Sequence, residues 1–151
     1  MKIRIFFFFF LLIGCKSPVD LEEDKFKIES LLPDGKWGNK KFIVVVPLEN
    51  ACSSCSLITL QQLVLLPDEY KSSIGVVLTA KSYKLINNMI IDLDLSGFEV
   101  FQDGEYKFWK KQLVQRNPKY YYFENQKIVE DGQITTFDIE GFIFAVNSRL
   151  K

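Results

Sequence analysis

The sequence predicts a single α/β domain in which helices cover both faces of a central mixed sheet. Strand-like and helix-like segments alternate along most of the chain, which is typical of a sheet with parallel strands. Toward the C-terminus two strand-like segments follow one another directly, which indicates a hairpin and hence an antiparallel pair. About 137 residues follow a predicted leader, enough for one domain with one core.

The leader, residues 1–14, has the pattern of a signal peptide. Two basic residues precede nine apolar residues, 5–13, a run too short to cross a bilayer as a helix of about 20 residues. The next letters, LIGC at 12–15, resemble the lipobox of bacterial lipoproteins. This resemblance implies that Cys15 carries a lipid and that the folded part lies outside the cytoplasm, anchored to a membrane of the cell envelope. An ordinary secretory signal with an incidental cysteine is the alternative.

After residues 1–14 the chain holds 17 basic and 19 acidic residues, a net charge near −2. This small charge gives no electrostatic reason to expect nucleic acid as a partner. The segment 15–24 is polar and acidic, with almost nothing to bury, so we expect a tether between lipid and domain. The domain is expected over 25–151, with a weak strand at 25–32 as its first element.

The first clear strand is expected at 41–47, a β-branched run of the kind that is buried on both faces of a sheet. A helix should follow it, because Leu57, Leu60 and Val64 recur at helical spacing. Pro67 ends this pattern, since proline cannot continue a helix.

A second strand is expected at 73–80. Ser82 is placed to cap the helix that follows, which carries its apolar residues on one face. These apolar residues are Leu85, Ile86, Met89 and Ile90. A short third strand at 98–101 ends in a turn at 101–104. The next helix is expected around an inner stripe formed by Tyr106, Trp109 and Leu113.

The last elements are a hairpin and a helix. The strand-like segments 119–123 and 127–130 flank a tight connection at Asn125 and Gln126. Thr135 and Asp138 have capping-box spacing ahead of the final helix. The apolar residues of that helix are Ile139, Phe142, Ile143, Val146 and Leu150. The expected order is therefore βαβαβαββα.

Cys52 and Cys55 lie between the first strand and its helix, and three interpretations apply to them. A structural zinc site takes four ligands, commonly Cys and His, whereas the chain after Cys15 has two thiols and no histidine. A purely structural disulfide across a two-residue gap would constrain little of the unfolded chain. Redox work is the interpretation that the residues favour, with an inert pair as the alternative.

The element order, the CxxC at 52–55, and Asn117-Pro118 just before the hairpin together resemble the thioredoxin fold. The nearest resemblance is to the envelope-anchored, TlpA-like thiol-disulfide oxidoreductases, and it spans nearly the whole of the expected domain. It implies that Cys52 is the nucleophile at a helix N-terminus and that Cys55 resolves the mixed disulfide. It also implies a cis bond before Pro118, with the backbone of Asn117 free to bind an extended substrate peptide.

Two positions depart from the pattern of that family. Ala51 stands where many members carry Trp before the first cysteine. The position at which thioredoxin keeps a buried carboxylate for proton transfer falls on Val46. Glu49 is the nearest acidic residue, but a loop position predicts that it is solvated. We therefore expect water to take part in proton transfer.

The expected function is that of a membrane-anchored thiol-disulfide oxidoreductase that reduces protein substrates. Its expected partners are protein thiols or disulfides and a membrane protein that donates electrons, and neither a cofactor nor a metal is expected. The alternative is a non-catalytic, thioredoxin-like lipoprotein that binds a protein partner, because a fold does not by itself determine a function.

Overall fold

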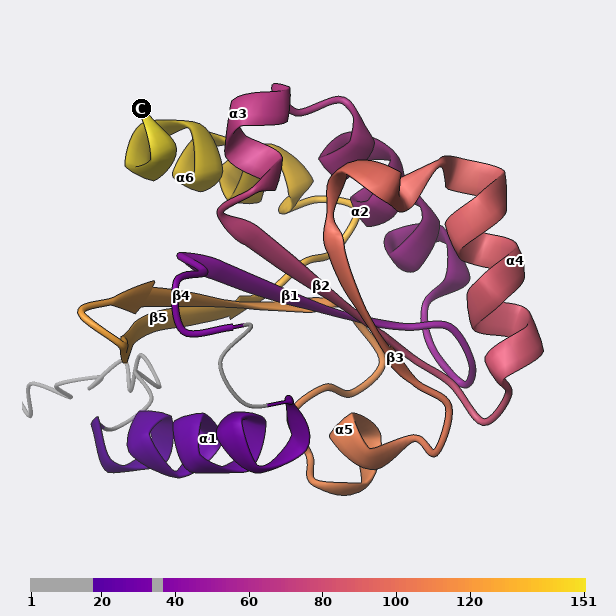
Figure 1. Ribbon diagram of the computed structural model, residues 1–151, viewed down its shortest axis with the longest axis horizontal. Helices are drawn as coiled ribbons and strands as arrows, with labels where there is room; N and C mark the ends of the chain where they lie inside the picture. Colours follow the sequence, from indigo (N-terminus) through magenta and orange to yellow (C-terminus); the bar gives the residue numbers. More distant parts are fainter. Residues whose placement is uncertain (1–17, 34–36) are drawn as a thin grey trace, which may run out of the picture.

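Figure 1 shows the computed structural model of the protein, which describes residues 18–33 and 37–151. In this part of the chain a sheet forms the middle layer and helices lie on both of its faces. The prediction of an α/β fold with a mixed, doubly covered sheet is confirmed. The predicted signal peptide, 1–14, and the predicted lipid site, Cys15, lie outside the described residues.

The sheet has five strands in the order β3-β2-β1-β4-β5. The strands are β1 (Phe42–Pro47), β2 (Ile74–Thr79), β3 (Glu99–Asp103), β4 (Lys119–Glu124) and β5 (Lys127–Gln133). β1, β2 and β3 are parallel, whereas β4 is antiparallel to β1 and β5 is antiparallel to β4. Asn125 and Gln126 alone connect β4 to β5, and both have a positive φ, as two-residue hairpin turns require.

The helices divide between the two faces of the sheet (Figure 1). One face is covered by α2 (Ser53–Val64), α4 (Tyr83–Leu93) and α6 (Ile139–Leu150), and the other by α1 (Pro18–Leu31) and α5 (Lys107–Lys110). The short helix α3 (Asp68–Lys71) and the 3₁₀ turn η1 (Leu95–Gly97) complete the order of elements. Among the described residues, no helix combines the length and the apolar character needed to cross a membrane.

β1 is the central strand, and its side chains alternate between two cores. Phe42, Val44 and Val46 belong to the core under α2, α4 and α6. Ile43 and Val45 belong to the core under α1 and α5. All five side chains are at most 2 % exposed, which explains why this segment of the sequence is apolar without alternation.

The N-terminal part of the expected domain differs from its prediction. The weak strand expected at 25–32 is wrong, because these residues continue helix α1 to Leu31. Residues 18–24, assigned to the tether, are the first part of the same helix. Leu21 packs against the core on this face and Asp24 is buried, so packing begins before residue 25.

Two other helices differ in extent or orientation. The helix expected around Tyr106, Trp109 and Leu113 is only the four-residue α5, because Tyr106 and Gln112 have φ values of 61° on either side of it. In α2 the predicted stripe is partly wrong, since Leu57 is 42 % exposed. The side chains that α2 buries are instead Cys55, Ser56, Thr59, Leu60 and Leu63.

Candidate functional site

The candidate site lies where the parallel strands end. Pro47, Thr79 and Asp103 are the last residues of β1, β2 and β3 and are paired in register. Beyond them, the backbone N–H of Leu48 donates to Thr79 O at 3.0 Å, and that of Ala80 donates to Asp103 O at 3.0 Å. The carboxyl edge of parallel strands is where open α/β sheets place their binding and catalytic groups.

The two cysteines form a disulfide at this edge. Their sulfurs are bonded at 2.10 Å and their Cα atoms are 5.2 Å apart. Cys52 is the N-cap of α2, and its Sγ accepts a hydrogen bond from the backbone N–H of Cys55 at 3.3 Å. Cys52 is partly exposed, whereas Cys55 is 4 % exposed. The expected placement, with the first cysteine at the helix N-terminus and the second enclosed, is confirmed.

Polar groups surround the Cys52 sulfur on the helix side. Ser54 Oγ lies 3.4 Å from Cys52 Sγ, within hydrogen-bonding distance of a sulfur atom. The first-turn N–H groups of α2 and the helix dipole also favour negative charge at this position. If the disulfide is opened, these groups stabilise a thiolate at Cys52 more than at Cys55.

One small polar residue of α2 bonds to the end of β1 and another bonds within the helix, and the apolar pattern indicated neither. Ser56 Oγ donates to Pro47 O at 2.6 Å, and Thr59 Oγ1 donates to Cys55 O at 2.7 Å. Both side chains are buried. Their small size allows α2 to lie close to the end of β1, which explains why the buried side of the helix differs from the predicted stripe.

The segment that precedes β4 contacts the Cys52 backbone. The N–H of Cys52 donates to Arg116 O at 2.7 Å, and Pro118 O accepts from the N–H of Ile134 at 2.7 Å. The prediction of a cis bond before Pro118 is wrong, because no peptide bond in residues 18–33 and 37–151 is cis. The trans bond is the lower-energy isomer of an X-Pro bond by about 0.5–1 kcal/mol. The loop therefore contacts the Cys52 backbone through Arg116 O, and the bond between Asn117 and Pro118 is trans.

Among the described residues, the side chain of Asn117 is hydrogen-bonded, whereas its backbone is not. Its side-chain amide donates to Gln133 Oε1 at 3.1 Å. Within the described chain, its backbone N–H and carbonyl take part in no hydrogen bond. Arg116 and Asn117 form a bend just before β4, and an unpaired backbone N–H and C=O at such a position are groups that a peptide strand can pair with.

No acidic residue stands at the position where thioredoxin keeps its buried carboxylate, because Val46 occupies it and is fully buried. The acidic residues that do lie near the site have other partners. Glu49 Oε2 accepts from the backbone N–H of Lys81 at 2.5 Å, so its carboxylate is held in the loop. Asp103, which the sequence assigned to a turn, is 3 % exposed and has both oxygens occupied. Asp103 therefore fixes the loop after β3.

Tyr106 joins this loop to the one that carries Cys52. Its hydroxyl donates to Glu49 O at 2.6 Å, and its ring stacks on Trp109 with centroids 5.1 Å apart and an interplanar angle of 9°. The pKa of Tyr106 is raised above its ordinary value, mainly by burial. A hydrogen bond from Asn50 lowers this pKa in part, and the charge of Glu49 raises it further. Tyr106 was read as part of a helix stripe, and nothing local in the sequence indicates this contact.

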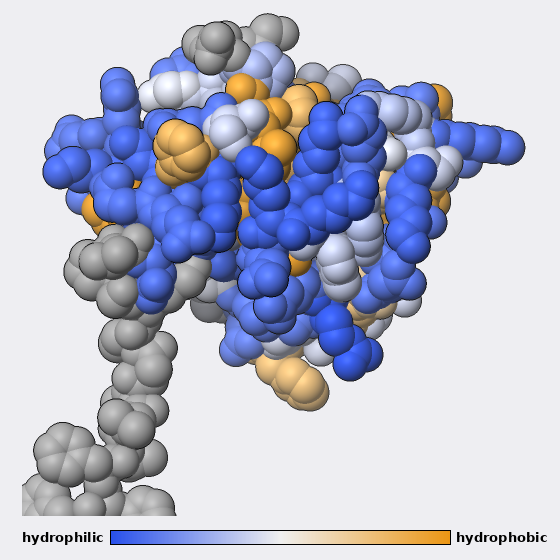
Figure 2. Space-filling view, turned by 90° about the horizontal axis from the view of Figure 1, so that it is seen from below, coloured by the Kyte–Doolittle hydropathy of each residue, from blue (hydrophilic) through white to orange (hydrophobic). Residues whose placement is uncertain are grey.

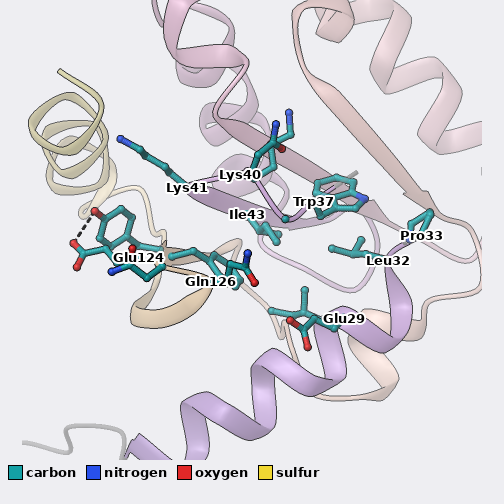
Figure 3. A pocket seen from close by; sticks show the side chains of 15 residues that line it. Glu29, Leu32, Pro33, Trp37, Lys40, Lys41, Ile43, Glu124 and Gln126 are labelled. Carbon is teal, nitrogen blue, oxygen red and sulfur yellow. Dashed lines mark hydrogen bonds between the residues drawn. The ribbon is translucent and has the colours of Figure 1, made fainter. Parts of the chain in front are cut away.

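A large pocket lies at the opposite end of β1 (Figure 3). It has a volume of about 810 Å³ and lies between α1, the β4–β5 turn and the start of β1. Ile28, Leu32, Trp37 and Ile43 contribute apolar side chains to its lining. Figure 2, seen from the α1 side, shows apolar residues in a narrow strip between hydrophilic ones. Neither cysteine lines this pocket, so it is separate from the disulfide.

Comparison with models of known protein families, with curated proteins and with solved structures gives no match. Membership of the thioredoxin-like family therefore stays a prediction from the residues quoted above. Within the described chain, no three His, Cys, Asp or Glu side chains are grouped so that they could hold a metal ion.

Proposed function

We propose that the protein is a thiol-disulfide oxidoreductase of the bacterial cell envelope that exchanges disulfides with protein substrates. The observation that carries this proposal is the placement of the two sulfurs, with Cys52 partly exposed at the N-cap of α2 and Cys55 buried one turn later. A thioredoxin-like identity and a lipid on Cys15 belong to the same proposal. The order of elements supports the first, and the LIGC motif at 12–15 supports the second.

In the reducing direction the reaction begins with both cysteines as thiols, and Cys52 first loses its proton to water. The Cys52 thiolate attacks one sulfur of a substrate disulfide and forms a mixed disulfide, and the other substrate sulfur leaves as a thiolate that takes a proton from water. Cys55 then loses its proton to water and attacks the Cys52 sulfur. The Cys52–Cys55 bond forms and the second substrate thiolate leaves and is protonated. The substrate gains two electrons and two protons, and a membrane dithiol protein must then reduce the Cys52–Cys55 bond.

Water serves as the proton carrier in this proposal because the nearby carboxylates are engaged. Glu49 accepts a hydrogen bond from the Lys81 backbone, and Asp103 accepts three in the loop after β3. Cys52 is open enough for water to reach its sulfur, since its side chain is partly exposed. Loss of a proton from Cys55 is then the slower event, because that thiol is enclosed.

A substrate segment is proposed to dock beside Cys52 as an extended strand. Asn117 offers an unpaired backbone N–H and carbonyl, and it follows directly after Arg116, whose carbonyl binds the Cys52 N–H. Pairing with the Asn117 backbone would position a substrate cystine near the exposed sulfur without selecting a particular sequence. The proposal assigns substrate binding to Asn117 and no part in it to Pro118, which is buried.

The test is turnover by the purified full chain in detergent, with insulin as the substrate and dithiothreitol as the reductant. The wild type should accelerate insulin reduction, and Cys52→Ser should abolish the acceleration. Cys55→Ser should trap a mixed disulfide between Cys52 and insulin, which mass spectrometry identifies. Cys15→Ser is the matched control, because it removes the third cysteine and should keep turnover in detergent.

A wild type as slow as Cys52→Ser in both reduction of insulin and oxidation of a dithiol peptide would contradict the proposed activity. That result would favour the alternative, a thioredoxin-like lipoprotein that binds a protein partner without exchanging disulfides.

A further inference from the structure

The loop that carries Cys52, residues 48–52, is held at both of its ends. At one end the Leu48 N–H donates to Thr79 O at 3.0 Å, and at the other the Cys52 N–H donates to Arg116 O at 2.7 Å. Between these ends Asn50 has a φ of 53°, a left-handed conformation that asparagine adopts more readily than most residues with a side chain. The backbone therefore turns at Asn50 between its two hydrogen-bonded ends.

The Tyr106 hydroxyl accepts a hydrogen bond from the Asn50 side chain, and two further contacts act on the middle of this loop, both at Glu49. Its carboxylate accepts from the Lys81 N–H in an exposed position, where water competes for the same groups. Its backbone carbonyl accepts from the Tyr106 hydroxyl at 2.6 Å, in a partly buried position. The second contact is better shielded, and it acts on the backbone itself.

Tyr106 is rigid enough to act as a support. Its side chain is 4 % exposed and stacked on Trp109. The loop around it is fixed by Asp103, whose carboxylate accepts from the N–H groups of Lys107 at 2.9 Å and Phe108 at 2.8 Å. The same carboxylate accepts from the Thr79 hydroxyl at 2.6 Å, which ties this loop to the end of β2.

We propose, on the basis of the proposed role of Cys52 as the attacking sulfur, that Tyr106 is a positioning residue for that sulfur. Through the Glu49 carbonyl it keeps Cys52 at the N-cap of α2, where the sulfur receives the Cys55 N–H. Tyr106 itself touches neither substrate nor sulfur in this role. Without its hydroxyl the loop relaxes, and the sulfur spends less time in contact with the helix N-terminus.

The experiment compares Tyr106→Phe with the wild type in the reduced full chain. The substitution removes only the hydroxyl and keeps the ring that stacks on Trp109. Peptide-resolved mass spectrometry follows the rate of iodoacetamide alkylation at Cys52 from pH 5 to pH 9. We expect the rate at neutral pH to fall about two- to tenfold, the range that one hydrogen bond contributes, and the pH profile to move to higher pH.

Tyr122→Phe is the matched control. It also removes a hydroxyl that donates a hydrogen bond, here to Glu124 at 2.8 Å, but Tyr122 pairs with Phe42 at the opposite end of β1. Its alkylation profile should coincide with that of the wild type. If Tyr106→Phe also coincides with the wild type, the positioning role is wrong, whatever its effect on unfolding.

A second variant covers the case in which Tyr106→Phe does not fold. Thr79→Val is nearly isosteric and removes the hydroxyl that holds Asp103, so it should loosen the Tyr106 loop and move the profile in the same direction. An unchanged Thr79→Val profile then counts against the proposal. Insulin turnover by the wild type decides the proposed activity separately, because thiol alkylation needs neither substrate nor turnover.

Discussion

Replacement of Asp103 by Ala should destabilise the protein, because this carboxylate holds the loop after β3 at the carboxyl edge of the sheet. The Asp103 carboxylate accepts hydrogen bonds from Thr79 Oγ1 at 2.6 Å and from the backbone N–H groups of Lys107 and Phe108 at 2.9 and 2.8 Å. Its side chain is 3 % exposed, so water cannot replace these bonds without opening the loop.

The magnitude follows from the donors that the substitution leaves unpaired. The Thr79 hydroxyl and the Phe108 N–H are both buried, and each buried donor without a partner costs about 1–3 kcal/mol. Together they amount to about 2–6 kcal/mol. Removal of a buried negative charge offsets part of this cost, so we expect a loss of about 2–4 kcal/mol in the free energy of unfolding.

Urea denaturation followed by tryptophan fluorescence measures this loss. Asp103→Asn should lose about half as much, since the Thr79 hydroxyl can accept from the new amide while the amide oxygen still accepts from a backbone N–H. Asp92→Ala, at an exposed position of α4, is the control and should stay within about 0.5 kcal/mol of the wild type. A loss below about 1 kcal/mol for Asp103→Ala would show that the loop does not depend on this carboxylate.

Four further outcomes are expected. In the reduced chain Cys52 should be alkylated more than about tenfold faster than Cys55, because Cys52 is partly exposed at a helix N-terminus whereas Cys55 is buried; equal slow labelling would contradict its role as nucleophile. Ser56→Ala should lower the free energy of unfolding by about 1 kcal/mol in urea, because it removes a buried hydrogen bond. Pro118→Ala should cost about 0.4–1 kcal/mol through the entropy of the unfolded chain and keep insulin turnover, since the bond is already trans. Burial, with the charges of two aspartates, raises the pKa of Tyr121 above 10.0, so the unfolded chain ionises first and stability falls above about pH 10; Tyr121→Phe should flatten that fall in a pH series of urea melts.

Most of the fold was predictable because its signals are local. The apolar run of β1 and the period of α4 are short patterns that burial imposes on neighbouring residues. The residues Asn125 and Gln126 indicated the hairpin by their position between two strand-like segments. Each signal lies within a few residues of the element that it predicts.

Helix α1 was missed because its docking depends on distant residues. Its acidic composition indicated a solvated tether, yet Asp24 pairs with Lys119 at 3.5 Å across 95 positions of sequence. Lys119 also pairs with Asp131 at 2.7 Å and lies over the Tyr121 ring at 4.5 Å. The charged side chains of Asp24, Lys119 and Asp131 are therefore largely buried against the sheet, although the sequence alone indicated that the acidic segment of α1 is solvated.

In the candidate site, too, the features with local sequence signals were predictable and those that depend on distant residues were not. The CxxC motif and the helical pattern after it located Cys52 and Cys55, because strand, loop and helix follow one another in sequence. The contacts of Asp103 with Thr79 and of Tyr106 with Glu49 span 24 and 57 positions and left no local pattern. The isomer before Pro118 was not predictable either, because the two X-Pro isomers differ by only about 0.5–1 kcal/mol.

The contacts that hold the Cys52 loop bear on how the disulfide can cycle. Leu48 donates to Thr79 O, Tyr106 donates to Glu49 O, and the Cys52 N–H donates to Arg116 O. None of these three bonds involves a sulfur atom, so opening the bond between Cys52 and Cys55 breaks none of them. The backbone of the loop can then remain in place while the sulfurs separate by side-chain rotation. For the proposed exchange reaction this means that none of the three backbone bonds has to break when the disulfide opens, and the change falls on the two sulfurs and the groups that contact them.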